Sequence, residues 1–200
     1  MNGHYNYLGE YPISQNPNVE KIFDDFLKNE KFSIIVEIGT QFGGLTFLIR
    51  DILNKYSKDT PIISYDVYQR GDLKRQCIER NIDFRLVDCF NDNELPFIIE
   101  NNERVLLICD GGNKIEEFNQ FSSYLKTGDI VMCHDYSPTV EYFEENMKGK
   151  VWDWLEISDS YIQKSIDKYN LKKHETYYDL FLNLSSWGVF IKHYDDNTKL

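Results

Sequence analysis

The feature that most constrains the fold is a repeated alternation of short apolar segments with amphipathic ones. Five segments are rich in β-branched or large apolar residues, and most of them are apolar throughout rather than alternating with polar residues. They are residues 34–38, 62–66, 84–88, 105–110 and 130–135. Continuous apolar strands are typical of parallel sheets that are covered on both faces. The alternation therefore predicts an α/β fold with a doubly wound sheet.

The segments between these strands carry apolar residues at helical spacing. Three stripes have this spacing: Val19, Ile22, Phe23 and Phe26; Leu45, Leu48, Ile49, Ile52 and Tyr56; and Ile115, Phe118, Ser122 and Leu125. Near the end, residues 178–184 and 188–192 are strand-like and flank Ser185-Ser186-Trp187, which predicts an antiparallel hairpin. The expected sheet is thus mostly parallel and seven-stranded, with a C-terminal antiparallel hairpin.

The chain length and the lack of a linker indicate a single domain over residues 1–200. No Pro/Gly-rich linker and no repeat beyond the β-α unit interrupts it. We interpret residues 1–17 as an N-terminal arm or lid. Residues 137–176 are expected to form a helical segment that covers the substrate, because aromatic side chains such as Trp152, Trp154 and Tyr161 are good platforms for sugars or rings.

The net charge of −11 argues against a nucleic-acid partner, because such binding depends on Lys and Arg side chains that neutralise phosphates. A small molecule or a neutral glycan is the favoured partner. No apolar run approaches the ~20 residues of a membrane helix, and the N-terminus lacks the pattern of a secretory signal. The sequence therefore predicts a cytoplasmic protein without a membrane partner, and it does not indicate an oligomeric state.

Acidic residues stand at the ends of all five predicted strands. They are Glu37, Asp66, Asp88, Asp110 and Asp135. A single acidic residue at such a position is commonly a helix cap. Because all five predicted strands end in an acidic residue, we expect a ligand site at the carboxyl edge of the sheet. Because like charges repel, a bound cation or several hydroxyl donors are needed to offset their proximity.

The first strand leads into a glycine-containing turn, Glu37-Ile-Gly-Thr-Gln-Phe-Gly-Gly44. It is neither the GxGxxG of dinucleotide enzymes nor a phosphate loop. A tight turn without a ligand is one interpretation. The other is a cofactor site, with contacts from the turn and from the end of the fourth strand: Glu37, Gly39, Thr40, Gln41, Phe42, Gly43 and Asp110. In a cofactor site Asp66, followed by Val67, can accept hydrogen bonds from ribose hydroxyls, and Asp88, followed by Cys89, can accept from an adenine amino group.

This set of motifs resembles class I S-adenosylmethionine-dependent methyltransferases. The residues that carry the resemblance are the 36–44 turn, Asp66, Asp88, Asp110-Gly-Gly-Asn113, and the run 128–135 that ends in His134 and Asp135. The sequence is most similar to the cephalosporin hydroxylase-like family, which includes macrolide-sugar and rhamnosyl O-methyltransferases. The similarity covers roughly residues 12–136 and the strand at 187–192. It implies a Rossmann-like methyltransferase fold with S-adenosylmethionine as cofactor.

The resemblance also implies a divalent metal beside the methyl donor, held by Asp110, His134 and Asp135. Carboxylates suit Mg²⁺, and an imidazole shifts the preference toward Mn²⁺, Fe²⁺ or Co²⁺. The sequence has His134 where the family usually has an acidic residue, and Asn113 where a histidine is common. A metal-dependent and a metal-independent reaction therefore both stay open.

The function that follows from the resemblance is O-methylation of a hydroxyl on a small molecule or sugar. Asp110, His134 and Lys114 are the candidate catalytic residues, with His134 as a general base, or Lys114 if burial lowers its pKa. Two alternatives stay open: a Rossmann-like nucleotide-binding oxidoreductase, and a non-catalytic protein that keeps the fold.

Overall fold

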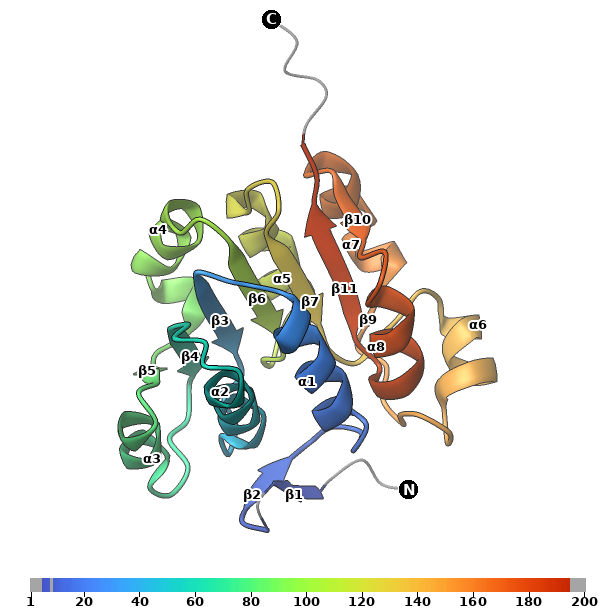
Figure 1. Ribbon diagram of the computed structural model, residues 1–200. Coiled ribbons are helices and arrows are strands. Elements are labelled where there is room, and N and C mark those ends of the chain that lie inside the picture. The colour runs from blue at the N-terminus through green and yellow to red at the C-terminus, as the bar shows by residue number, and fades with distance from the viewer. Residues whose placement is uncertain (1–4, 8, 195–200) are drawn as a thin grey trace, which may run out of the picture.

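The computed structural model describes residues 5–7 and 9–194, which build a seven-stranded sheet with helices on both faces (Figure 1). The strand order is β10-β11-β7-β6-β3-β4-β5. Its strands are β3 (Ile34–Ile38), β4 (Ile62–Asp66), β5 (Asp83–Leu86), β6 (Val105–Cys109), β7 (Ile130–Cys133), β10 (Leu171–Lys173) and β11 (Gly188–Lys192). Strands β7 to β5 are parallel, and β11 pairs antiparallel with β7 and β10. The predicted mostly parallel, seven-stranded sheet is confirmed.

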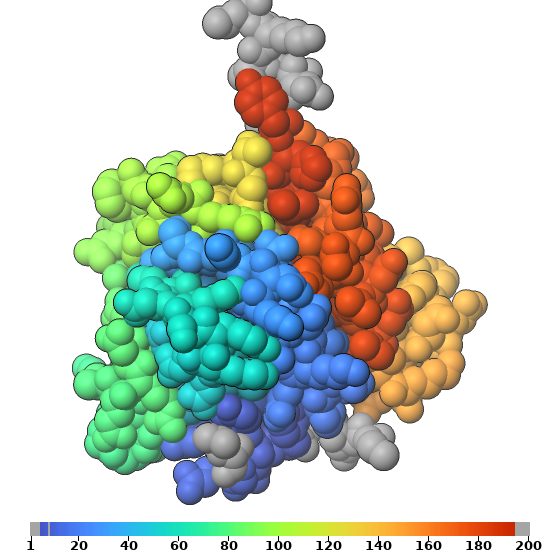
Figure 2. Space-filling view, viewed as in Figure 1, coloured from blue at the N-terminus to red at the C-terminus, as the bar shows by residue number. Residues whose placement is uncertain are grey.

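Helices cover both faces of the sheet. The helices are α1 (Val19–Asn29), α2 (Gly44–Lys55), α3 (Leu73–Glu79), α4 (Glu94–Asn101), α5 (Lys114–Phe121), α6 (Val140–Tyr142), α7 (Asp159–Lys168) and α8 (Tyr178–Ser185), with the short turns η1 (Cys89–Asn91), η2 (Ser122–Tyr124) and η3 (Phe143–Met147). In Figure 2, α1 lies between α2 and α8 on the near face. Helices α4, α5 and α7 pack against the far face, so the sheet is doubly wound as predicted.

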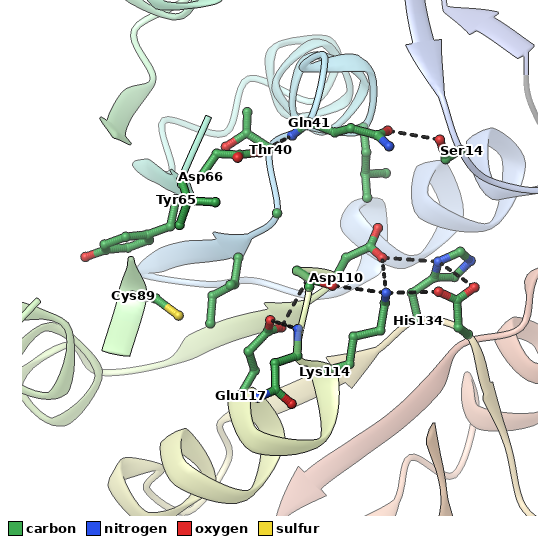
Figure 3. Close-up of a pocket in the computed structure, with 18 of the residues that line it drawn as sticks. Ser14, Thr40, Gln41, Tyr65, Asp66, Cys89, Asp110, Lys114, Glu117 and His134 are labelled. Atoms are coloured by element: carbon green, nitrogen blue, oxygen red, sulfur yellow. Dashed lines mark hydrogen bonds and ion pairs between the residues drawn. The ribbon is translucent and has the colours of Figure 1, made fainter. Parts of the chain in front are cut away.

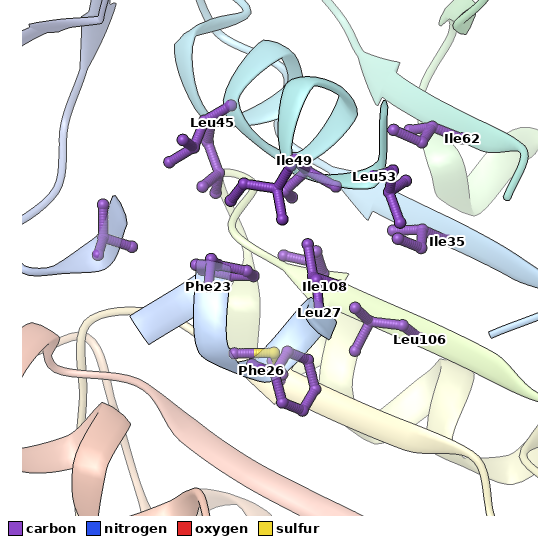
Figure 4. Close-up of a cluster of buried hydrophobic side chains, with 14 of the residues drawn as sticks. Phe23, Phe26, Leu27, Ile35, Leu45, Ile49, Leu53, Ile62, Leu106 and Ile108 are labelled. Carbon is purple, nitrogen blue, oxygen red and sulfur yellow. The ribbon is translucent and has the colours of Figure 1, made fainter. Parts of the chain in front are cut away.

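The core is divided by the sheet into two apolar layers. Because side chains alternate along a strand, Ile35 faces α1 and α2 while Val36 faces the other layer. In the first layer, Phe23 and Phe26 of α1 pack against strand residues, as Figure 4 shows. Each fully buried side chain of this size contributes about 1.5–3 kcal/mol of transfer free energy. Packing of the two layers on the sheet fixes the positions of the strand ends relative to one another.

The predicted C-terminal hairpin is wrong in one strand, because residues 178–184 lie within helix α8. The run Tyr-Asp-Leu-Phe-Leu-Asn-Leu fits an alternating pattern as well as a helical one. The structure buries Tyr178, Phe181, Leu182 and Ser185, which is the i, i+3, i+4, i+7 face of a helix. Besides β7, the antiparallel neighbour of β11 is β10, which precedes α8.

The two segments expected to cover the site have strands of their own. In the arm, β1 (Tyr5–Tyr7) pairs with β2 (Tyr11–Ile13) against α2, while residues 1–4 and 8 lie outside the described residues. The 137–176 segment is only partly helical, because β9 (Ile157–Ser158) pairs with β8 (Tyr136–Ser137). Over residues 5–7 and 9–194, no helix is long and apolar enough to cross a bilayer.

The turn after β3 touches the turn after β6 through backbone atoms. The amide of Asp110 donates to the Ile38 carbonyl at 2.9 Å, and Gly39 has a φ of +100°. A Cβ at Gly39 would collide with the Asp110 carbonyl and lie 2.8 Å from the Gly111 nitrogen. Glycine is required at residue 39 both for this dihedral angle and for the close approach.

We therefore expect Gly39→Ala to lower the free energy of unfolding by about 3 kcal/mol, because the clash is with backbone that cannot rotate away. Gly128→Ala is the matched control: Gly128 has a φ of +92° but open space around it. Its expected loss is about 1 kcal/mol from the dihedral alone. Chemical denaturation measures both, and equal losses would show that the contact with Asp110 does not matter.

Glu37 lies below this turn and is almost completely buried. Its Oε2 accepts hydrogen bonds from Thr46 of α2 and Ser64 of β4, so it joins three elements. Burial raises the pKa of Glu37 to about 7, although the hydrogen bonds from Ser64 and Thr46 act in the opposite direction. In the unfolded chain the same carboxyl titrates near 4.5.

This difference predicts a pH-dependent stability. Between about pH 4.5 and 7 the folded state retains a proton on Glu37 that the unfolded state has lost, so stability falls as pH rises through this window. Glu37→Gln should remove a fall on the order of 3 kcal/mol between pH 5 and pH 8. Urea unfolding at both pH values measures it, with the exposed Glu100→Gln as control. A variant that keeps the slope of the parent protein would contradict the assignment.

Candidate active site

A cavity of about 740 Å³ opens at the carboxyl ends of the parallel strands. It lies where the strand order reverses, between β3 and β6, which is the position at which open α/β sheets bind ligands. Its walls come from the turns after β3, β4, β5, β6 and β7, from the arm, and from the covering segment. The volume is in the range of small-molecule and cofactor sites.

Most of the predicted cofactor residues line this cavity. Those that line it are Gly39, Thr40, Gln41, Asp66, Val67, Asp88, Cys89 and Asp110. Glu37 is buried beneath the turn, and Gly43 lies at the start of α2. Phe42 stacks with the Arg70 guanidinium at 4.8 Å and faces a separate, smaller groove. The side chains of Glu37 and Phe42 therefore point away from the space in which a cofactor would lie.

Asp66 organises the side of the cavity that the turns after β3 and β4 form. Its two carboxylate oxygens accept hydrogen bonds from the backbone N–H of Gln41 at 2.7 Å and the backbone N–H of Tyr68 at 2.8 Å. Each oxygen retains a lone pair for a further donor. Tyr68 and Phe90 supply rings to the same wall. This half of the cavity can accept hydroxyl hydrogens and flank a planar base.

Asp110, His134 and Asp135 converge on the opposite side of the cavity (Figure 3). The Nδ1 of His134 lies 3.2 Å from Asp110 Oδ1 and 3.4 Å from Asp135 Oδ1. One ligand atom of each residue lies within 4.8 Å of the others, so the three residues form a group that could hold a metal ion. The structure thus brings together the three residues that the sequence analysis named, directly after β6 and β7.

Gln15 of the arm is a site residue that sequence reasoning missed. Its Nε2 donates to Asp110 Oδ2 at 2.8 Å and lies 3.2 Å from His134 Nδ1. Its Oε1 accepts from the Trp187 indole at 2.9 Å, which fixes the orientation of the amide. The only available signal was that Gln15 falls within residues 12–136, over which the sequence resembles the family. Contacts across 95 and 172 positions of sequence are not readable from local pattern.

Lys114 extends from the first turn of α5 into the acidic group. Its Nζ lies 2.9 Å from Asp135 Oδ2, 2.8 Å from Glu156 Oε2 and 3.8 Å from Asp110 Oδ1. Burial lowers the pKa of Lys114, but the charges of Asp110 and Asp135 outweigh it and raise the pKa above its ordinary value. Lys114 is therefore held as a cation, which disfavours the general-base role considered for it.

The two aspartates differ in their affinity for a proton. Burial raises the pKa of Asp110, and the charges of His134 and Lys114 offset it only in part. For Asp135 the same two charges and the bonds from Lys114 and Trp152 outweigh burial and lower the pKa. Asp110 is thus the carboxylate better suited to take a proton, while Asp135 stays ionised.

His134 lies beside Asp110 and Asp135 in the cavity wall and is almost completely buried. Its ring packs between Trp152 and Trp187, at centroid distances of 4.9 and 4.8 Å, and is 2% exposed. Burial lowers the pKa of His134, but Asp135 and Asp110 raise it above its ordinary value. Its Nε2 is buried and has no hydrogen-bond partner within residues 5–7 and 9–194. This placement favours action through Asp110 over direct contact with a substrate.

The covering segment contributes Trp152, Trp154 and Glu156 to the cavity wall. The two indoles meet edge to face at 5.1 Å, and Trp152 donates from Nε1 to Asp135 Oδ1. Tyr161 is exposed on α7 and does not reach the cavity. Glu156 was not predicted, because nothing in its local sequence marks it as facing Lys114.

No family model and no curated protein sequence matches the chain. Solved structures match its fold at low sequence identity. The apo structure of CmcI superposes with a TM-score of 0.69 at 17% identity, covering 96% of this chain and 77% of CmcI. CmcI with Mg and SAM gives 0.65 at 17% identity, over 95% and 77% of the two chains.

A putative caffeoyl-CoA O-methyltransferase from Staphylococcus aureus matches with a TM-score of 0.57 at 12% identity, covering 92% of this chain and 87% of that protein. Fibrillarin from Aeropyrum pernix, solved with bound S-adenosyl-L-methionine, matches with a TM-score of 0.57 at 15% identity, over 94% and 81%. Together with the strand order and the site at the switch point, these similarities show that the chain has the class I S-adenosylmethionine-dependent methyltransferase fold.

Proposed function

We propose that this chain is an S-adenosylmethionine-dependent O-methyltransferase that acts on a hydroxyl of a small molecule or sugar. The observation that carries the proposal is a single cavity with two chemically different halves. The turns after β4 and β5 supply the Asp66 and Asp88 carboxylates for a nucleoside. The turns after β6 and β7 supply a compact group of charged side chains for the reacting atoms.

Methyl transfer is an in-line displacement in which the acceptor oxygen bonds to the methyl carbon as the sulfonium S–C bond breaks. The acceptor proton passes to Asp110, whose carboxyl group borders the cavity and whose pKa is raised. S-adenosylhomocysteine and the methyl ether are the products. Holding both reactants in line lowers the barrier by on the order of 7–11 kcal/mol in favourable cases.

The chemistry of the cavity favours a neutral acceptor. Trp152 and Trp154 present flat faces that suit sugars and rings. Acidic side chains outnumber the basic ones in the cavity wall, which disfavours phosphorylated or carboxylated acceptors. The net charge of −11 disfavours nucleic acid on the same ground.

A divalent metal would be held by Asp110, His134 and Asp135, and when bound it would lower the pKa of the acceptor hydroxyl. The ligand types and their spacing fit such an ion, but their neighbours do not. N–H donors compete with a metal for the carboxylate oxygens, and the Lys114 ammonium beside Asp135 would repel a cation. The proposed reaction therefore does not proceed through a metal.

Calorimetric titration with S-adenosylmethionine tests whether the chain binds the proposed cofactor. We expect saturable binding by the parent protein and about 10- to 100-fold weaker binding by Asp66→Ala, which loses a charged hydrogen-bond acceptor and the anchor of the turn. Asp179→Asn, exposed on α8, is the control and should bind as the parent does. Binding of NAD in place of S-adenosylmethionine would identify an oxidoreductase and reject the proposal.

Release of S-adenosylhomocysteine, measured with each member of a panel of sugar and phenolic acceptors, tests whether the chain transfers the methyl group. With any acceptor turned over by the parent protein, Asp110→Asn should reduce kcat by about 10²- to 10⁴-fold, because the acceptor proton loses its base. Cofactor affinity, measured on the same preparation, should change far less. An Asp110→Asn enzyme with parental kcat would remove Asp110 from the reaction.

A further inference from the structure

All four carboxylate oxygens of Asp110 and Asp135 already have protein nitrogens beside them. Asp110 Oδ1 lies 3.2 Å from His134 Nδ1, and Asp110 Oδ2 accepts from Gln15 at 2.8 Å. Asp135 Oδ1 accepts from the Trp152 indole, and Asp135 Oδ2 lies 2.9 Å from Lys114 Nζ. The carboxylates are thus compensated by the chain itself.

Two of these neighbours cannot serve as metal ligands in this arrangement. The Trp152 indole has only an N–H to offer. The Trp187 indole, which is also only a donor, holds the oxygen of Gln15, so that Gln15 turns its amide nitrogen toward Asp110. The arm and the covering segment therefore present donors to the acidic pair, where the shell of a metal ion would require lone pairs.

Of the other two neighbours, His134 could offer a ring nitrogen to a metal, whereas Lys114 is a cation in the middle of the acidic group. Its ammonium lies within 4 Å of Asp110, Asp135 and Glu156, and its side chain is 7% exposed. Lys114 Nζ also donates a hydrogen bond to the Gly111 carbonyl at 3.1 Å, which fixes the position of the ammonium. Figure 3 shows Lys114 pointing between Asp110 and the carboxylate beside His134. A divalent ion bound there would be repelled by Lys114 at short range.

We infer that the Lys114 ammonium is the resident cation of this site and takes the place of a divalent metal. This inference rests on the proposed function and extends it: the chain binds its cofactor and transfers the methyl group without Mg²⁺ or Mn²⁺. Lys114 offsets the repulsion between Asp110 and Asp135, and its positive charge stabilises the acceptor oxygen as that oxygen loses its proton. Metal ions bind only when they displace Lys114 from Asp135.

The test compares metal binding by the parent protein and by Lys114→Met, both first stripped with EDTA. Methionine has a similar length and no charge. In calorimetric titration with Mn²⁺ or Mg²⁺, the parent should show no saturable binding up to the millimolar range. Lys114→Met should bind Mn²⁺ at least about tenfold more tightly than the parent, because two carboxylates lose their counter-charge. Mn²⁺ should raise the Tm of this variant and not that of the parent.

Lys148→Met is the matched control, since Lys148 is exposed and pairs with Glu144 away from the cavity. Its metal titration should equal that of the parent. Saturable binding of Mn²⁺ by the parent at micromolar concentration, or a gain in cofactor affinity when Mg²⁺ is restored, would overturn the inference. So would a folded Lys114→Met that binds Mn²⁺ no better than the parent.

If Lys114→Met does not fold, metal titrations of Lys114→Gln and of the parent protein test the same inference about Lys114. The proposed function fails separately: a parent protein that binds no S-adenosylmethionine with or without metal rejects the methyltransferase. The metal titrations would still show whether Lys114 is the cation of the acidic group.

Discussion

The backbone contact between the turn after β3 and the turn after β6 is the constraint on which the site depends. Gly39 has no side chain, so the Asp110 carbonyl can approach it closely while the Asp110 amide bonds to Ile38. One turn lines the proposed cofactor half of the cavity, and the other carries Asp110 of the acidic group. Their contact sets the distance between the two halves of the cavity, and the apolar layers on both faces of the sheet keep that distance fixed.

This geometry brings several carboxylates to one rim, and the structure compensates them with groups from distant segments. Gln15 comes from the arm, Trp152 from the covering segment, and Lys114 from the helix after β6. The arm and the covering segment therefore have an electrostatic function in addition to closing the cavity. A group of charges assembled in this way is preorganised, since its donors and charges are in place before a ligand arrives.

Much of the fold was predictable because parallel strands buried on both faces have a distinctive sequence. The predicted bounds of β3 and β4 agree with the structure, and the acidic residues lie at the strand ends as expected. The segment 178–184 was predicted wrongly because its residues satisfy two periodicities, and contacts with α1 and the sheet select the helical one. Local pattern determines an element only where one period excludes the other.

The sequence by itself determined the order of the parallel strands, the glycine turn, and the set of acidic residues that meet at the carboxyl edge, because these follow from local periodicity and from the geometry of parallel strands. Only the tertiary structure decided how those acids are compensated. The pairings of Asp110 with Gln15 and of Lys114 with Glu156 join residues that are 95 and 42 positions apart. Such contacts depend on how loops pack over the sheet, and no local pattern encodes that packing.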